Sequence, residues 1–272
     1  MEYHNPVLLK ETVDGLNINP DGIYVDVTFG GGGHSREILS RLSEKGRLYA
    51  FDQDEDALKN AIDDERFVLI NENFRYIKRF LRFYGVKKVD GVLGDFGVSS
   101  HQFDVAERGF SIRFDADLDM RMSKKMEVSA YDVVNDYEEG DLRRIFSVYG
   151  ELNNARAIAA QIVASRDREI KTIADLKEVL QKFLPKHVEH KVLAKIFQAI
   201  RIEVNQELAV IEEFLMQAPE LLDKGGRLSL ISYHSLEDRL VKRFIRNGMF
   251  EGEPEKDFFG NVDVPFKKVG KM

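Results

Sequence analysis

Short apolar segments alternate with helical periods in the N-terminal part of this chain, and this alternation constrains the fold most. Strands are predicted at Ile23–Val27, Arg47–Phe51, Phe67–Ile70 and Gly91–Gly94. Helical periodicity occupies the intervals between them, as at 55–62 and 77–84. Strands joined by helices form right-handed βαβ units, so the pattern predicts an α/β fold with a mostly parallel sheet.

A helical block then interrupts this alternation. Helices are predicted at 130–134, 138–149, 155–165, 173–183 and 192–216, with Asp141 and Thr172 as N-caps. A helix end with a glycine turn at 221–226 and a strand at Arg227–Ser232 follow. Because the α/β pattern resumes, we expect one discontinuous domain, residues 1–115 and 217–272, with an inserted all-helical domain at 116–216.

The composition excludes several classes of protein. The chain has 272 residues and no cysteine, so disulfides and thiolate metal sites are excluded, which suits the cytoplasm. No signal peptide and no membrane-spanning apolar run is found, so we expect neither export nor membrane insertion. The net charge of −7 means that any nucleic acid must be bound by local basic patches rather than by bulk charge.

A glycine run, Gly30–Gly33, separates the first strand from the following helix. In open α/β sheets this edge binds ligands, and glycine lets the backbone approach them closely. Asp52 ends the second strand, where a carboxylate can accept hydrogen bonds from both ribose hydroxyls of an adenosine. The spacing is not that of a dinucleotide fingerprint, since Ser35 takes the last glycine position, and no phosphate-binding Lys-Ser/Thr pair follows. A nucleoside cofactor is indicated, either NAD or S-adenosylmethionine.

The segment Asp95–Gln102 follows the fourth strand, where amino-methyltransferases place a polar loop that meets the substrate amine. The lone pair of a cytosine amine is delocalised into the ring, so the amine is a poor nucleophile. A carboxylate that accepts one of its N–H hydrogen bonds restores electron density and can take the proton. Asp95 is the acid of this loop. It either activates the amine in this way or binds the amino group of the cofactor's methionine.

Seven segments, in this order and over nearly the whole chain, resemble the MraW/RsmH family of small-subunit ribosomal RNA cytosine-N4 methyltransferases. They are His4–Leu9, Thr28–Ser35, Asp95–Gln102, Glu107–Ser111, Leu118–Met122, Phe197–Ile202 and Ile231–Arg239. The resemblance implies a class I (Rossmann-like) methyltransferase sheet with an inserted helical domain. Phe96 and His101 depart mildly from the family's leucine and proline, and the family's basic C-terminal segment is not found before Met272. This segment is either lost or lies outside this sequence, so its effect on substrate affinity stays open, whereas cofactor binding is less affected by it.

The resemblance also assigns roles to individual positions. Its cofactor contacts fall on Gly32, Gly33, His34, Asp52, Phe74, Asp95 and Gln102. Without it, Phe74 would be read as a core phenylalanine and His34 as a helix-start residue. Asp95, Tyr233 and His234 are the expected catalytic residues, with Tyr233 and His234 placed to stack on or hydrogen-bond a splayed base.

Basic side chains indicate where RNA could bind. Arg239, Lys242, Arg243 and Arg246 share one face of a predicted amphipathic helix, and Arg108 and Arg113 follow the Asp95 loop. His187 and His190 are expected to be a surface pair, because methyl transfer requires no metal. The helical block is expected to recognise the substrate, although a role in packing or homodimer formation stays open.

Together with the resemblance, the sequence leads us to expect a cytoplasmic enzyme that transfers methyl from S-adenosylmethionine to cytosine N4. The resemblance implies that this cytosine lies in the decoding region of small-subunit (16S) ribosomal RNA. The RNA is expected to lie within an assembled 30S particle. Three alternatives remain: a methyltransferase acting on DNA or a small amine, an NAD-dependent oxidoreductase, and a non-catalytic RNA-assembly factor.

Overall fold

The computed structural model describes residues 6–260 and 262–269. They form two compact units, one running up to Gly97 and again from Leu208, the other spanning Val98–Glu207. His4 and Asn5 of the first family segment, and the C-terminal Met272, lie outside the described residues. Within those ranges, no helix is long and apolar enough to cross a membrane.

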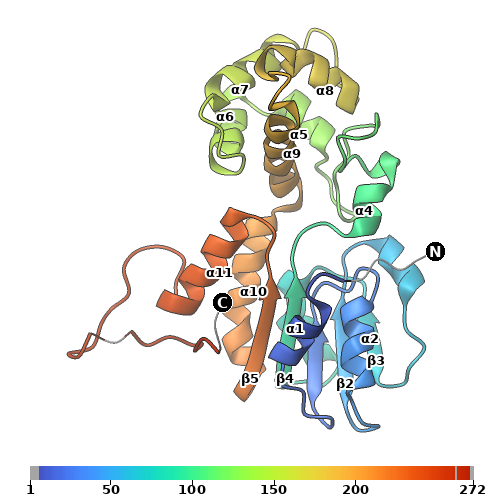
Figure 1. The fold of residues 1–272 in the computed structure, drawn as a ribbon, viewed down its shortest axis with the longest axis vertical. Helices are drawn as coiled ribbons and strands as arrows, with labels where there is room; N and C mark the ends of the chain where they lie inside the picture. Colours follow the sequence, from blue (N-terminus) through green and yellow to red (C-terminus); the bar gives the residue numbers. More distant parts are fainter. Residues whose placement is uncertain (1–5, 261, 270–272) are drawn as a thin grey trace. The chain divides into compact units, whose positions relative to one another are not determined.

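The first unit contains a five-stranded sheet in the order β3-β2-β1-β4-β5 (Figure 1), and every pair of neighbouring strands is parallel. Its strands are β1 Ile23–Asp26, β2 Arg47–Phe51, β3 Phe67–Ile70, β4 Val89–Asp95 and β5 Leu222–Ile231. The helices of this unit are α1 Leu9–Gly15, α2 Gly33–Ser40, α3 Ile77–Phe83, α10 Glu207–Leu221, which starts at the last residue of the other unit, and α11 Ser235–Asn247. The predicted parallel α/β sheet is confirmed.

Alternate strand residues face opposite sides of this sheet, so each face is buried by its own helices. Val25 and Val92 pack in one apolar cluster with residues of α3, α10 and α11. Tyr24 and Leu93 pack in the other with residues of α1 and α2. The sheet is thus covered on both faces, which leaves its strand ends free to carry functional groups.

Three predicted elements of this unit differ in detail. β5 begins at Leu222, and the predicted glycine turn is an irregularity within it: Val89 pairs with Leu222 but Gly91 pairs with Arg227. The helix predicted at 55–62 is the 3-10 helix η1, Glu55–Asn60, and a second 3-10 turn, η2 Phe74–Tyr76, leads into α3.

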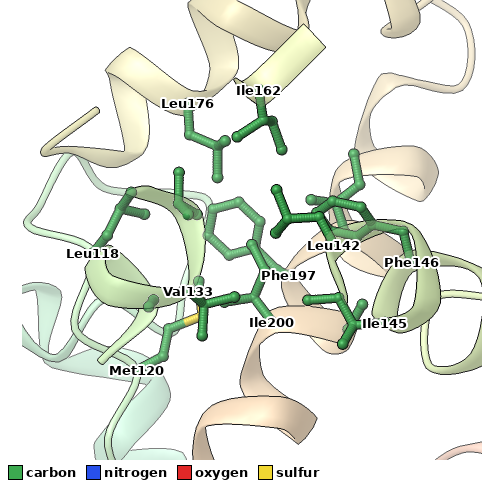
Figure 2. Close-up of a cluster of buried hydrophobic side chains, with 14 of the residues drawn as sticks. Leu118, Met120, Val133, Leu142, Ile145, Phe146, Ile162, Leu176, Phe197 and Ile200 are labelled. Carbon is green, nitrogen blue, oxygen red and sulfur yellow. The ribbon is translucent and has the colours of Figure 1, made fainter. Parts of the chain in front are cut away.

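The second unit is helical. Its elements are α4 Ser100–Asp104, η3 Ala106–Arg108, α5 Ala130–Asp136, α6 Glu139–Val148, α7 Ala155–Ala164, α8 Ile173–Leu180, η4 Gln181–Phe183 and α9 Glu189–Asn205. In the described chain between 98 and 207, β pairing is limited to an isolated bridge between Asp117 and Thr172. Figure 2 shows its core, where Phe197 of α9 lies among side chains from the surrounding helices. The predicted all-helical block is confirmed.

Helix boundaries in this block follow local backbone geometry. The helix predicted at 192–216 is two helices, α9 and α10, because Gln206 between them is left-handed with φ 51°. Thr172 is confirmed as the N-cap of α8, where it forms a capping box with Asp175. Asp141 is not an N-cap, since α6 already starts at Glu139.

The unit boundaries lie at 97/98 and 207/208, whereas the sequence places the domain boundaries at 115/116 and 216/217. Phe110 belongs to the core of the helical unit, with Val98 and Ile112 packed against it. Ile211 and Phe214 of α10 belong to a core of the sheet unit. Packing of these apolar side chains, which periodicity does not reveal, sets the boundaries of the units.

The fully buried Phe146 of α6 gives a test of the helical core. Replacing it with alanine should destabilise the helical unit by about 3–5 kcal/mol, because a large cavity remains. Val148 ends the same helix and is 52% exposed, so Val148→Ala should cost no more than about 0.5 kcal/mol. Hydrogen exchange of the amides of α6, α7 and α9 measures the loss of stability in both variants. Similar losses for the two variants would contradict the packing described.

Candidate active site

A buried carboxylate anchors the glycine loop. Asp26, the last residue of β1, is completely buried and accepts hydrogen bonds from the Ser35 hydroxyl at 2.6 Å and the Thr28 amide at 3.1 Å. Burial raises the pKa of Asp26, and the hydrogen bond from Ser35 opposes that rise. Asp26 therefore ties the start of the loop to the first turn of α2. Asp26 is not among the predicted site residues, although an acid inside an apolar strand was a usable signal.

Asp52 joins the end of β2 to the same loop. One carboxylate oxygen accepts from the Gly30 amide at 2.7 Å, and the other accepts from the Asp54 amide at 2.9 Å. Burial raises the pKa of Asp52 to about 6, despite these two hydrogen bonds. A carboxylate oxygen can accept more than one hydrogen bond, so Asp52 keeps acceptor capacity for a ligand.

The loop geometry requires glycine at two positions. Gly32 has a φ of 76°, and a Cβ there would lie 2.8 Å from the ring of Phe29. A Cβ on Gly33 would lie 2.2 Å from Cγ of Pro6. The run is thus a closely packed turn at the N-terminus of α2 rather than a flexible linker.

His34 lies between the N-terminal segment and β4. It is 5% exposed, with Nε2 3.3 Å from the Val7 carbonyl oxygen and Nδ1 3.9 Å from a carboxylate oxygen of Asp95. The structure therefore brings two predicted cofactor residues, His34 and Asp95, next to each other.

Asp95 ends β4 with an incompletely satisfied carboxylate. Its amide donates to the Thr28 hydroxyl at 2.7 Å, which joins the ends of β1 and β4. Its side chain is hydrogen-bonded to Tyr233, but its buried Oδ1 has no hydrogen-bond partner. Burial raises the pKa of Asp95, and the hydrogen bond with Tyr233 opposes the rise. An unsatisfied acceptor of this kind is suited to binding an N–H group.

Glu237 positions the two other predicted catalytic residues. It is completely buried and accepts from the Tyr233 amide at 2.9 Å, while a carboxylate oxygen lies 3.2 Å from Nε2 of His234. Nδ1 of His234 accepts from the Glu237 amide at 3.4 Å, so His234 is the N-cap of α11. Glu237 is not among the predicted site residues, although an acid three residues after an N-cap is typical of a capping box.

Phe74 belongs to an aromatic cluster. Its ring stacks on Phe96 at 5.9 Å between centroids and meets Phe214 of α10 edge-on at 5.6 Å. Phe74 is only partly buried, and it packs against the apolar cluster on one face of the sheet. It is thus a packing residue that also exposes aromatic surface.

Three further predicted site residues, Gln102, Arg108 and Arg113, lie in the helical unit. Gln102 is buried, and its side chain accepts from the Ser99 amide at 3.1 Å to complete the capping box of α4. Arg108 is 6% exposed and donates to the backbone carbonyls of Arg121 and Met122. This location does not suit a phosphate contact. Arg113 is exposed and pairs with Asp104 at 2.9 Å.

The predicted basic helix is confirmed as α11. Its buried face contains Leu236, Val241 and Phe244, and its four basic residues are exposed: Arg239, Lys242, Arg243 and Arg246. Lys242 pairs with Asp238 at 2.8 Å, and Arg243 donates to the Gly252 carbonyl at 2.9 Å. These contacts are weak at an exposed surface, so a polyanion can replace them.

The MraW methylase family model matches residues 1–256 of the chain. The chain belongs to the MraW methylase family. A family relative from Flavobacterium johnsoniae, named ribosomal RNA small subunit methyltransferase H, is 71% identical over 273 residues that cover all of this chain and 90% of the relative. A relative of the same name from Christiangramia forsetii is 68% identical, with the same coverage of both chains.

Membership of a methylase family decides between the two nucleoside cofactors that the glycine loop and Asp52 left open. The cofactor is S-adenosylmethionine, and the NAD-dependent oxidoreductase alternative is set aside. His187 lies in a turn and His190 in α9, and neither belongs to a group of potential metal ligands among the described residues.

The pKa of Asp52 gives a pH test for this MraW family member. The ionised carboxylate accepts ribose hydrogen bonds better than the neutral acid, so affinity for S-adenosylhomocysteine should rise as the pH increases through about 6. From pH 5 to pH 7 the gain should be up to about tenfold, following the ionised fraction. Isothermal titration calorimetry measures the affinity for S-adenosylhomocysteine at each pH. Asp52→Asn should bind weakly with no such gain, whereas Asp63→Asn, at an exposed site, should retain the pH profile.

The hydrogen bond from Ser35 to Asp26 gives a stability test. Ser35→Ala should destabilise the sheet unit by about 1–3 kcal/mol, because the buried carboxylate loses a partner. Ser40→Ala, at an exposed position of the same helix, should change stability by less than about 0.5 kcal/mol. Urea unfolding followed by hydrogen exchange in β1 and α2 checks this. Equal effects would show that Asp26 does not depend on Ser35.

Proposed function

We propose that this chain transfers a methyl group from S-adenosylmethionine to N4 of a cytosine in the decoding region of small-subunit ribosomal RNA. The observation that carries the proposal is the 71% identity, over the whole chain, to a relative named ribosomal RNA small subunit methyltransferase H. The convergence of Gly32, Asp52 and Asp95 at the carboxyl edge of the sheet supports it, because ligands of open α/β sheets bind there.

The residues of this edge fit the cofactor. Asp52 has acceptor capacity for ribose hydroxyls, and the partly exposed ring of Phe74 offers an apolar surface for adenine. Gly32 and Gly33 keep side chains out of the turn where the nucleoside approaches the backbone. His34 joins this set by its place beside Asp95, whereas Gln102, also carried over from the family, belongs to the helical unit. The bound cofactor supplies an electrophilic methyl carbon.

Asp95 is the proposed acceptor for the target amine. Its Oδ1 has no hydrogen-bond partner and can accept one N–H of the cytosine amine, which returns electron density to nitrogen. Its raised pKa makes the carboxylate a stronger base for the proton released on methylation. Tyr233 donates to the same carboxyl group and thereby fixes its orientation. In-line placement of amine and methyl carbon supplies several kcal/mol of the rate enhancement.

RNA is proposed to reach this edge along α11. Tyr233 is 55% exposed and lies two residues after the end of β5, so it can stack on a base that has left the RNA helix. His234, N-cap of α11, is the second candidate contact of that base. The exposed stripe of Arg239, Lys242, Arg243 and Arg246 would meet phosphates. Arg113, exposed on the helical unit, is proposed as a separate phosphate contact. Arg108, held by backbone carbonyls, is not included in this surface.

We propose that the sheet unit and the helical unit have different roles. The sheet unit carries the methyltransferase site, and the helical unit recognises the RNA. We infer that the substrate is the assembled 30S particle, because an acidic chain gains little from bulk attraction to free RNA and benefits from a preformed surface. A ribosomal substrate in turn implies a cytoplasmic enzyme.

Mass spectrometry of nucleosides from small-subunit RNA tests the proposal. RNA from cells lacking the gene should lose an N4-methylated cytidine, and purified enzyme with S-adenosylmethionine should restore it on isolated 30S particles. Asp95→Ala should reduce turnover at least about a hundredfold, since it removes the acceptor of the amine proton. Its binding to 30S particles should be unchanged.

Two results would overturn this assignment. Equal methylation of DNA or a small amine would favour the broader methyltransferase alternative. Loss of particle binding by Asp95→Ala with unchanged turnover would favour an RNA-assembly factor. Asp63→Ala is a matched control, because Asp63 is an exposed acid outside the proposed site and the variant should retain full turnover.

A further inference from the structure

A second basic surface lies at the amino ends of the parallel strands, whereas the candidate active site lies at their carboxyl ends. We call it the edge patch; it comprises Lys78, Arg79, Arg82, Phe83, Lys87 and Lys88, from α3 and the segment that leads into β4. The stretch 75–88 contains six lysines and arginines and no acid, in a chain whose net charge is −7. The local charge is therefore opposite to that of the whole chain.

Two of the three cations that line a surface cavity in the edge patch form no ion pair among the described residues. Lys78, Arg82 and Lys87 line a surface cavity of about 520 Å³ together with Glu220. Lys78 pairs with Glu220. Within the described chain, neither Arg82 nor Lys87 forms an ion pair, and both are exposed. A cavity with two unpaired cations attracts an anion.

Aromatic rings lie beside these charges. Phe83 is 81% exposed, and its ring meets that of Tyr84 edge-on at 5.3 Å. Tyr84 is anchored in turn by the ring of Tyr49 in β2, at 5.6 Å. A large apolar ring held out in solvent next to cations is the arrangement that single-stranded nucleic acid uses, with phosphates on the cations and a base on the ring.

We propose that the edge patch is a second contact site for small-subunit ribosomal RNA, with Arg82 and Lys87 on phosphates and Phe83 against an unpaired base. This rests on the proposed function. The patch precedes β4, whereas Asp95 ends it; the seven residues of β4 separate the two by about 20 Å. The patch therefore contacts RNA away from the target cytosine and contributes affinity without taking part in methyl transfer.

The double variant Arg82→Ala/Lys87→Ala tests this, with Lys45→Ala/Lys59→Ala as a control that removes the same charge from exposed sites elsewhere in the sheet unit. Dissociation constants are measured over a salt series with 30S particles from cells lacking the gene and with protein-free small-subunit RNA. The patch variant should bind both about tenfold more weakly. Its log–log salt slope should be smaller by about 1.4 to 1.8, as expected for two lost phosphate contacts.

Turnover at saturating substrate and affinity for S-adenosylhomocysteine should be unchanged in the patch variant. Phe83→Ala should weaken RNA binding several-fold without changing the salt slope, because it removes stacking and no charge. Unchanged RNA affinity of the double variant would overturn the proposal, as would an equal loss in the control. Weaker binding to 30S particles but not to protein-free RNA would assign the patch to a ribosomal protein instead.

RNA binding is measured separately from methylation, so the experiments distinguish failure of the proposed function from failure of the edge-patch proposal. A wild-type enzyme that methylates no cytosine would end the proposed function. The comparison of RNA affinities between the patch variant and its control would still decide the role of the edge patch.

Discussion

The hydrogen-bonded tie between Asp26 and Ser35 is the constraint on which the candidate site depends. A fully buried carboxylate is costly unless it is hydrogen-bonded, so the chain must deliver Ser35 and Thr28 to it. Satisfying Asp26 therefore sets the path of the glycine loop. Gly30 then donates to Asp52 and Thr28 accepts from the Asp95 amide, so three strand ends converge on one loop.

Burial also shifts the pKa values of the carboxyl groups at this edge of the sheet. Asp26, Asp52 and Asp95 all have raised pKa values, chiefly because they are removed from water. Asp26 is fully engaged by the protein, whereas Asp95 retains a buried oxygen without a partner. The difference separates a structural carboxylate from one suited to binding a ligand, and Glu237 extends the arrangement by holding Tyr233 and His234 in place.

Charge is distributed in a way that suits an acidic enzyme with a polyanionic substrate. Cations gather on α11, beside the carboxyl edge of the sheet, and again before β4 at the other edge. Because charges at exposed sites are screened beyond about 8 Å at physiological salt, such patches act locally whatever the net charge of the chain. Two separated patches would fix the orientation of a large RNA better than one.

Local sequence determined the parallel α/β sheet, the helical block and the capping of α8 by Thr172, because periodicity and capping depend on neighbouring residues. The glycine loop and Asp52 also followed from their spacing. Tertiary structure alone decided that Arg108 is buried, where the two units begin and end, and which groups the acids Asp26 and Glu237 bind. Those outcomes depend on which distant side chains share a buried environment, and that information is absent from any single stretch of the chain.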